Sequence, residues 1–448
     1  MHPSITSLKP LLRKLLQMDL PVPQRTREEV RAERDQNYRW NFAVNLTDVT
    51  TFWFGLSFIS AATIVPLYIS KLTDSPIPIG LAAVIARGGW FLPQIFTSNF
   101  VERLPRKKPM IVNAGFFLER LPMWVIVLSA VIAAWNPTLA LIIFFIGYAW
   151  HGFGAGVAAT AWQDLIARCF PVNRRGRFLG IGFFLGALTG AIAAVISAQV
   201  LGGYTFPTNF LIAFFVAALA INISWVALAQ TREPVEPIAA PRQSTRQFWN
   251  DLPRILRRDE NYSHFLVARL LLAFSGMGIG FVTVAAISRW AIADSTVGLY
   301  TAAFLIGQTI GNLILGLVAD KIGHKLPLEI AAIGTALAFS VAWMAQLPEL
   351  YFLVFILLGM VEGATIVSGM SIVMEFSAPE KRPTYAGLTN TSIGVISMIG
   401  PMIGAILALL GYNWLFFASA VISILSFITF HWWVKEPRFS RSSPEQDD

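Results

Sequence analysis

Ionisable residues lie inside apolar segments long enough to cross a membrane, where a charge is costly and is usually kept for a function. His151 lies at the centre of the apolar segment 141–163, and Glu362 has a matching place in the segment 351–374. Asp48 and Arg269 interrupt two further apolar segments. Burial and neighbouring charges shift the pKa values of imidazole and carboxyl groups. These residues are therefore candidates for binding and releasing a proton.

Helical spacing gives each of these residues neighbours on the same face of its helix. Tyr148 precedes His151 by three residues, and Thr365 follows Glu362 by three, so each pair shares a face. We expect these faces to line a water-filled cleft that holds a solute or a proton. The predicted cavity residues are Asp48, Tyr148, His151, Arg269 and Glu362. The alternative interpretation is that they form fixed ion pairs that hold the helices together.

Three further charges inside apolar segments suggest an ion pair within the membrane. Arg87 and Glu119 belong to successive, oppositely directed segments and lie at similar depths for a helical rise of about 1.5 Å per residue. We therefore predict that Arg87 pairs with Glu119. Arg120 has no obvious partner in the sequence; Asp48 or an anionic solute are the options.

The composition is that of a membrane protein with many spans. The 448 residues are 55% hydrophobic and only 13% charged, whereas soluble domains carry about 25% charged residues. The single cysteine, Cys169, excludes an intrachain disulfide and a cysteine-rich metal site. Nothing in the sequence predicts a metal, a cofactor or an enzyme, and no HExxH, GxSxG or Walker pattern occurs.

Twelve apolar spans follow one another along the chain, most of them separated by short connectors. The predicted fold class is an all-α membrane protein with twelve transmembrane helices in two pseudo-symmetric six-helix bundles. The spans are 42–70, 79–99, 110–134, 138–163, 178–202, 208–229, 264–288, 297–318, 327–345, 350–375, 386–410 and 413–434.

The distribution of basic residues predicts the orientation in the membrane. Of the 34 Lys and Arg residues, 29 lie in the two tails and in alternate connectors, whereas only Lys71 and Arg289 lie in connectors on the other side. Connectors rich in Lys and Arg stay in the cytoplasm. We predict an inner (cytoplasmic) membrane protein with both termini cytoplasmic. The same bias accounts for the net charge of +8 without a nucleic-acid partner.

The second half of the chain repeats signals of the first half, as a duplication would. The stretch 34–38 (RDQNY) matches 258–262 (RDENY), and the basic connectors after the second and fourth spans match those after the eighth and tenth. The predicted domains are a basic cytosolic segment 1–40, a six-helix bundle 41–230, a cytosolic linker 231–262 with an amphipathic helix, a second bundle 263–435 and a cytosolic tail 436–448.

One repeated connector resembles a known family signature. The pattern Gly316-x-x-x-Asp320-Lys321-x-Gly323-His324-Lys325 is similar to the cytoplasmic loop of the major facilitator superfamily, and the residues around Glu102 and Arg103 are a degenerate copy of it. The resemblance implies a two-bundle secondary transporter that works by rocking. It implies a gating role for the cytosolic loops, with the candidate residues Glu102, Arg103, Asp320, Lys321, Arg175 and Arg382.

The sequence therefore predicts a secondary transporter of a small solute that works by alternating access. We expect proton coupling, a monomer, and a lipid bilayer, a small-molecule substrate and a proton or other coupling ion as partners. The alternative is a non-transporting membrane sensor that binds a ligand without flux. Residues 1–40 and 230–262 are short for the output domain that such a sensor would need.

Overall fold

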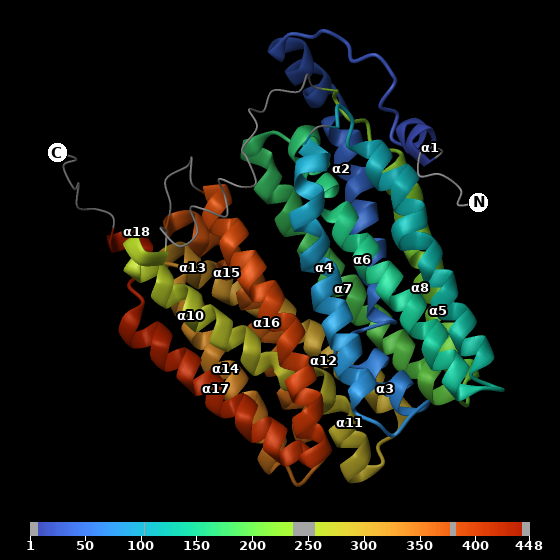
Figure 1. The fold of residues 1–448 in the computed structure, drawn as a ribbon, viewed down its shortest axis with the longest axis vertical. Helices are drawn as coiled ribbons and strands as arrows, with labels where there is room; N and C mark the ends of the chain where they lie inside the picture. Colours follow the sequence, from blue (N-terminus) through green and yellow to red (C-terminus); the bar gives the residue numbers. More distant parts are fainter. Residues whose placement is uncertain (1–7, 103, 236–255, 377–381, 441–448) are drawn as a thin grey trace, which may run out of the picture. The chain divides into compact units, whose positions relative to one another are not determined.

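The computed structural model describes residues 8–102, 104–235, 256–376 and 382–440, and these residues are almost entirely helical (Figure 1). The helices that belong to the first six spans are α2 (Arg27–Ser57), α3 (Ile64–Ser70), α4 (Ile77–Glu102), η2 (Met110–Ala114), η3 (Phe116–Arg120), α5 (Leu121–Ile132), α6 (Pro137–Cys169), α7 (Val172–Gly203) and α8 (Thr208–Ala229). A short helix, α1 (Leu8–Leu15), precedes them.

The last six spans contain a second set of helices. They are α10 (Glu260–Ser275), η4 (Gly276–Gly278), α11 (Ile279–Trp290), α12 (Asp294–Ile310), η5 (Gly311–Leu315), α13 (Gly316–Ile322), α14 (Lys325–Met344), α15 (Leu350–Phe376), α16 (Arg382–Leu410) and α17 (Tyr412–Trp433), followed by the short α18 (Pro437–Ser440). The predicted amphipathic helix of the linker falls mostly outside the described residues.

Ten of the helical segments within the described residues are long and apolar enough to cross a membrane. They include all the predicted spans from the third to the twelfth. The first two predicted spans correspond to α2 with α3 and to α4, which carry charged or polar residues. The predicted all-α membrane fold is confirmed.

The chain divides into two compact units. Unit 1 contains residues 1–59, 88–193 and 203–241, and unit 2 contains residues 60–87, 194–202 and 242–448. The units differ from the predicted bundles in two places, because residues 60–87 and 194–202 group with the second half of the chain. The boundaries of the predicted domains remain a prediction.

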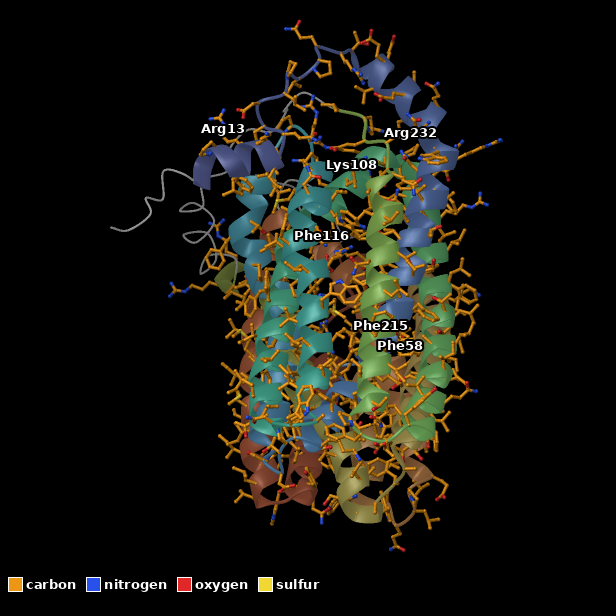
Figure 2. The ribbon with its side chains drawn as sticks, turned by 90° about the vertical axis from the view of Figure 1, so that its right-hand side faces the viewer. Arg13, Phe58, Lys108, Phe116, Phe215 and Arg232 are labelled. Atoms are coloured by element: carbon orange, nitrogen blue, oxygen red, sulfur yellow. The ribbon has the colours of Figure 1, made fainter. Side chains whose placement is uncertain are left out.

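Within unit 1, α2 packs against α8 and α5 packs against both α6 and α8. Buried apolar residues form a cluster at one end of this unit, where Phe170 stacks on Phe178 with ring centroids 4.2 Å apart. The segment after α1 lies at the same end: Leu16 is buried, and Asn113 Nδ2 donates a hydrogen bond to the Leu15 carbonyl (2.8 Å). The labelled basic residues Arg13, Lys108 and Arg232 mark this end in Figure 2.

Within unit 2, α15 packs against α12 and α14, and α17 packs against α10 and α14. Figure 1 shows α10, α14 and α17 running along one another. Tyr262 at the start of α10 is buried, and its hydroxyl lies 2.8 Å from Thr389 Oγ1 and donates to the Tyr385 carbonyl (3.0 Å). These bonds fix the first turn of α10, and hence the helix that carries Arg269.

The first predicted span is broken in the structure. Helix α2 ends at Ser57 in unit 1, and α3 begins at Ile64 in unit 2. Helix α3 packs against α11 and α12. Thr63 Oγ1 lies 2.6 Å from Thr301 Oγ1, and Lys71 Nζ lies 2.7 Å from Asp294 Oδ1. These contacts explain why residues 60–71 group with unit 2.

We predict that the double variant Thr63→Cys/Thr301→Cys forms a disulfide under mild oxidation, since the two side-chain oxygens that the sulfurs would replace are already in contact. Mass spectrometry of the digested protein measures the linked peptide. Cys169 is buried, so the single variant Thr63→Cys is a suitable control and should give no intrachain link. Failure of the double variant to oxidise would contradict the packing of α3 on α12.

Candidate functional site

A polar stripe on α2 faces α8 rather than open space. Asn45 and Asp48 are buried, and Asn45 Nδ2 donates to Thr231 Oγ1 (3.1 Å). Ser224 Oγ on α8 donates to Asp48 Oδ1 (2.6 Å). Seven residues further along α2, a Cβ at Gly55 would lie 2.9 Å from the Ile221 side chain. The face that was expected to line a cleft therefore packs on α8, and it carries Asp48 with it.

A second carboxylate and one guanidinium complete the surroundings of Asp48. Glu119 and Arg120 are buried neighbours on the π-helix η3 and form an ion pair. The charge of Arg120 also acts on Asp48. His151 on α6 is buried, and its Nδ1 lies 2.9 Å from the Glu119 carbonyl oxygen. We call Asp48, Glu119, Arg120 and His151 the unit 1 charge cluster.

The unit 1 charge cluster holds two carboxylates and a single guanidinium. With a neutral imidazole at His151 its formal charge is −1, and one additional proton makes it neutral. Arg120 Nε has no hydrogen-bond partner among the described residues. Its guanidinium carbon lies 5.7 Å from the centroid of the Phe52 ring, which provides a favourable contact for the cation. Charges interact strongly in an apolar environment, so the gain or loss of one proton changes the electrostatic energy of the cluster considerably.

Tyr148 lies one helical turn before His151 and takes part in aromatic packing. Its ring stacks on that of Phe144, with centroids 5.2 Å apart, and only 6% of the residue is exposed. The structure thus brings Asp48 and His151 into one cluster through Glu119 and Arg120, and it places Tyr148 on the same face of α6 as the histidine.

A second charge cluster lies in unit 2. Arg87 of α4 donates two parallel hydrogen bonds to Glu362 of α15, from Nη1 to Oε1 (3.1 Å) and from Nη2 to Oε2 (2.9 Å). Arg269 of α10 is 6% exposed, and its charge acts on both partners. We call Arg87, Arg269 and Glu362 the unit 2 charge cluster. Its formal charge is +1.

The predicted pairing of Arg87 with Glu119 differs from what the structure shows. Arg87 pairs with Glu362, and Glu119 pairs with its neighbour Arg120. Depth along the membrane says nothing about the direction in which a side chain leaves its helix, so it could not select the partner of Arg87. Glu119 and Arg120 are successive residues of η3, and their side chains form an ion pair there.

The predicted gating loops are described only in part. Arg175 Nη2 donates to the Ala167 carbonyl (2.7 Å), and the Asp320 carbonyl accepts from Arg438 Nη1 (3.0 Å). Lys321 is exposed. The side chains of Glu102, Arg103 and Arg382 lie outside the described residues. The gating role of these loops remains a proposal.

Sequence reasoning missed Glu233, which follows α8 and binds the loop before η2. Its carboxylate accepts hydrogen bonds from the backbone N–H groups of Lys107 (2.8 Å to Oε1) and Lys108 (2.9 Å to Oε2) and from Arg168 Nη1 (3.2 Å). Burial raises the pKa of the Glu233 carboxyl group, and the two backbone donors and Arg168 oppose this rise. The carboxylate thus ties the last helix of unit 1 to the loop that resembles the family signature.

Lys107 in the same loop is buried as completely as an apolar residue. Its side chain is 1% exposed, and its Nζ pairs with Asp164 Oδ2 (3.0 Å) and donates to the Val101 carbonyl. Burial lowers the pKa of Lys107, and the bond to Asp164 raises it in part. A buried amine of this kind is held in place by its partners.

Unit 2 repeats the arrangement with Glu436. Its Oε2 accepts the backbone N–H of Lys325 (2.8 Å), and Gly323 beside it has a φ of +109°, which a side chain rarely adopts. Glu233 and Glu436 are each followed by proline and each lie just beyond the last helix of a predicted bundle. This repeated Glu-Pro dipeptide is the signal in the sequence that would have located both residues.

Comparison with known proteins agrees with the fold and the repeated loops. The model of the family described as Major Facilitator Superfamily matches residues 268–448. The solved structure of a D-xylose–proton symporter has a TM-score of 0.65 at 15% identity, and the alignment covers 90% of this chain and 99% of that chain. The chain is thus similar to the major facilitator superfamily over residues 268–448, and its fold is similar to that of the symporter.

Two curated proteins illustrate the level of sequence similarity. The tetracycline resistance protein, class B, of Escherichia coli is 25% identical over 193 residues, which are 40% of this chain and 46% of that protein. The enterobactin exporter EntS of Salmonella typhimurium is 25% identical over 285 residues, which are 61% of this chain and 63% of that protein. The alignments therefore span less than two thirds of these relatives.

We predict that Glu233→Gln lowers the free energy of unfolding by about 2–4 kcal/mol, because a buried carboxylate that accepts several hydrogen bonds is replaced by an amide that cannot accept all of them. Chemical denaturation of the detergent-solubilised protein measures the loss. Exposed Glu28 on α2 provides the matched control, since Glu28→Gln breaks no such bond. Equal stability of the two variants would contradict the role of Glu233 in fixing the loop.

We also predict a pH-dependent contribution from His324, which lies 3.3 Å (Nδ1) from Ser368 Oγ. Burial lowers its pKa and Arg438 adds to this, whereas Glu375 and Asp320 act in the opposite direction. Below a pH of about 6.5 the unfolded chain binds a proton that the folded chain binds less readily, so stability falls as the pH falls. Replacing His324 removes this contribution.

The measurement is the midpoint of thermal unfolding between about pH 5 and pH 8. His324→Asn should lose less stability than the wild type as the pH decreases. Parallel curves for the wild type and His324→Asn would refute this contribution.

Proposed function

We propose that this protein is a secondary transporter of the major facilitator superfamily. It moves a small solute by alternating access and couples the movement to protons. The observation that supports coupling is the composition of the unit 1 charge cluster, in which Asp48 and Glu119 share one guanidinium, that of Arg120. A proton on either carboxyl group removes the excess charge, and the loss of that proton restores it.

Asp48 is the residue to which we assign the proton. Glu119 already makes a direct ion pair with Arg120, whereas Asp48 receives a hydrogen bond from Ser224 and a longer-range attraction from the same guanidinium. Protonated Asp48 keeps its place at Ser224, because that hydroxyl can either donate or accept a hydrogen bond.

Several features favour transport over the alternatives. The relatives and structural neighbours are named as exporters, symporters and resistance proteins. A ligand sensor would bind a solute without flux. The names of these proteins suggest the first solutes to test, namely tetracycline, enterobactin and D-xylose.

Reconstitution tests the proposal directly. Proteoliposomes that contain the purified full chain and a pH-sensitive dye inside report proton movement when a solute is added outside. Transport predicts a change in internal pH that depends on the solute and disappears with a protonophore. Binding of a solute without any flux would instead favour a sensor.

We predict that Asp48→Asn reduces proton-driven transport at least about tenfold and leaves solute exchange without a gradient nearly unchanged, since the amide keeps the bond to Ser224 but does not titrate. Radiolabelled solute flux with and without a pH gradient measures both. Asp74→Asn, at an exposed aspartate, is the matched control. If Asp48→Asn retained gradient-driven accumulation, the proton would have to travel through another group.

A further inference from the structure

The unit 2 charge cluster contains more positive charge than its own carboxylate can balance. Among the described residues of this cluster, Arg87 and Arg269 act on the carboxylate of Glu362, within apolar helices. A membrane-embedded charge is costly unless it is paired, and a surplus cation is retained where it meets a mobile anion. One further negative group would therefore neutralise the cluster.

Arg269 itself lacks part of its hydrogen bonding. It is 94% buried, and its Nε has no hydrogen-bond partner among the described residues. Its guanidinium lies against Gly369 of α15, where a Cβ would come within 2.8 Å of Nη2. The glycine leaves space for the flat guanidinium, and the unused Nε–H donor is a buried polar group of the kind that a ligand satisfies.

The other two members of the cluster are within reach of a solute. The side chains of Arg87 and Glu362 are 45% and 24% exposed, and the paired geometry at Arg87 is the one in which a guanidinium binds carboxylate or phosphate. Glu362 thus occupies the place at Arg87 that a carboxylate of a solute would take.

We propose that the unit 2 charge cluster is the binding site for the anionic group, a carboxylate or a phosphate, of the transported solute. Arg269 binds this group, and Glu362 competes with it for Arg87. The inference rests on the proposed transport function and adds the chemical class of the solute. Glu362 is then a positioning residue that releases Arg87 when the anion arrives.

Competition predicts opposite effects for two neutralising variants. Glu362→Gln removes the competitor and should tighten anion binding about tenfold, whereas Arg269→Gln removes a charge-assisted bond and should weaken it about tenfold or more. If the cluster served only to hold the helices together, both variants would lose stability and neither would bind an anion more tightly than the wild type.

The probes are benzoate and phenylphosphate, with benzamide as the neutral molecule of similar shape. Binding to the purified full chain in a neutral detergent is followed by calorimetry at fixed ionic strength, since salt screens the exposed part of the cluster. Arg39→Gln, at an exposed arginine on α2, is the control for the loss of a positive charge elsewhere. We expect anion-selective binding that follows the order Glu362→Gln, wild type, Arg269→Gln from tight to weak.

Several outcomes would count against the anion site. Absence of binding of both anions, equal binding of benzamide, or equal affinity in Arg269→Gln protein would overturn it. A lipid phosphate is tested in nanodiscs, and an Arg269-dependent effect of phosphatidylglycerol without one of benzoate or phenylphosphate would refute a solute site. Arg269-dependent binding with no flux in proteoliposomes would leave the anion site standing and reject the transport function.

Discussion

The free-energy cost of a charge in an apolar helical environment is the constraint on which the arrangement of this protein depends. Each charged side chain within the spans must find a partner, and the chain meets this requirement with two clusters of opposite formal charge. The unit 1 charge cluster has one carboxylate too many, and the unit 2 charge cluster has one guanidinium too many. This asymmetry between duplicated halves, in which His151 corresponds to Glu362, separates a site suited to protons from one suited to anions.

The sequence predicted the elements better than the contacts. The apolar spans, the repeat and the burial of Asp48 and His151 followed from composition and periodicity, because these properties are local. The partner of Arg87 did not follow, since it depends on the rotation of α4 about its axis. The contact of Glu119 with Arg120 did not follow either, because side chains of successive helical residues point about 100° apart and are not expected to pair. Glu233 was overlooked because a glutamate in a charged connector is usually solvated.

The duplication is more visible in the loops than in the charge clusters. Glu233 and Glu436 both accept backbone N–H groups from the loop that enters the third helix of their half, although the surrounding side chains differ. Unit 1 buries a lysine beside its loop, whereas unit 2 has His324 close to Glu375. The backbone arrangement is shared by the two halves, whereas the titratable groups beside it differ.

Helix α4 passes from unit 2 into unit 1 between Arg87 and Gly88, and the first span crosses between the units where α2 gives way to α3. Arg87 is therefore the last residue on its side of a covalent junction. Because Arg87 is bonded directly to Gly88, its ion pair with Glu362 holds unit 2 together at the residue where the chain leaves that unit.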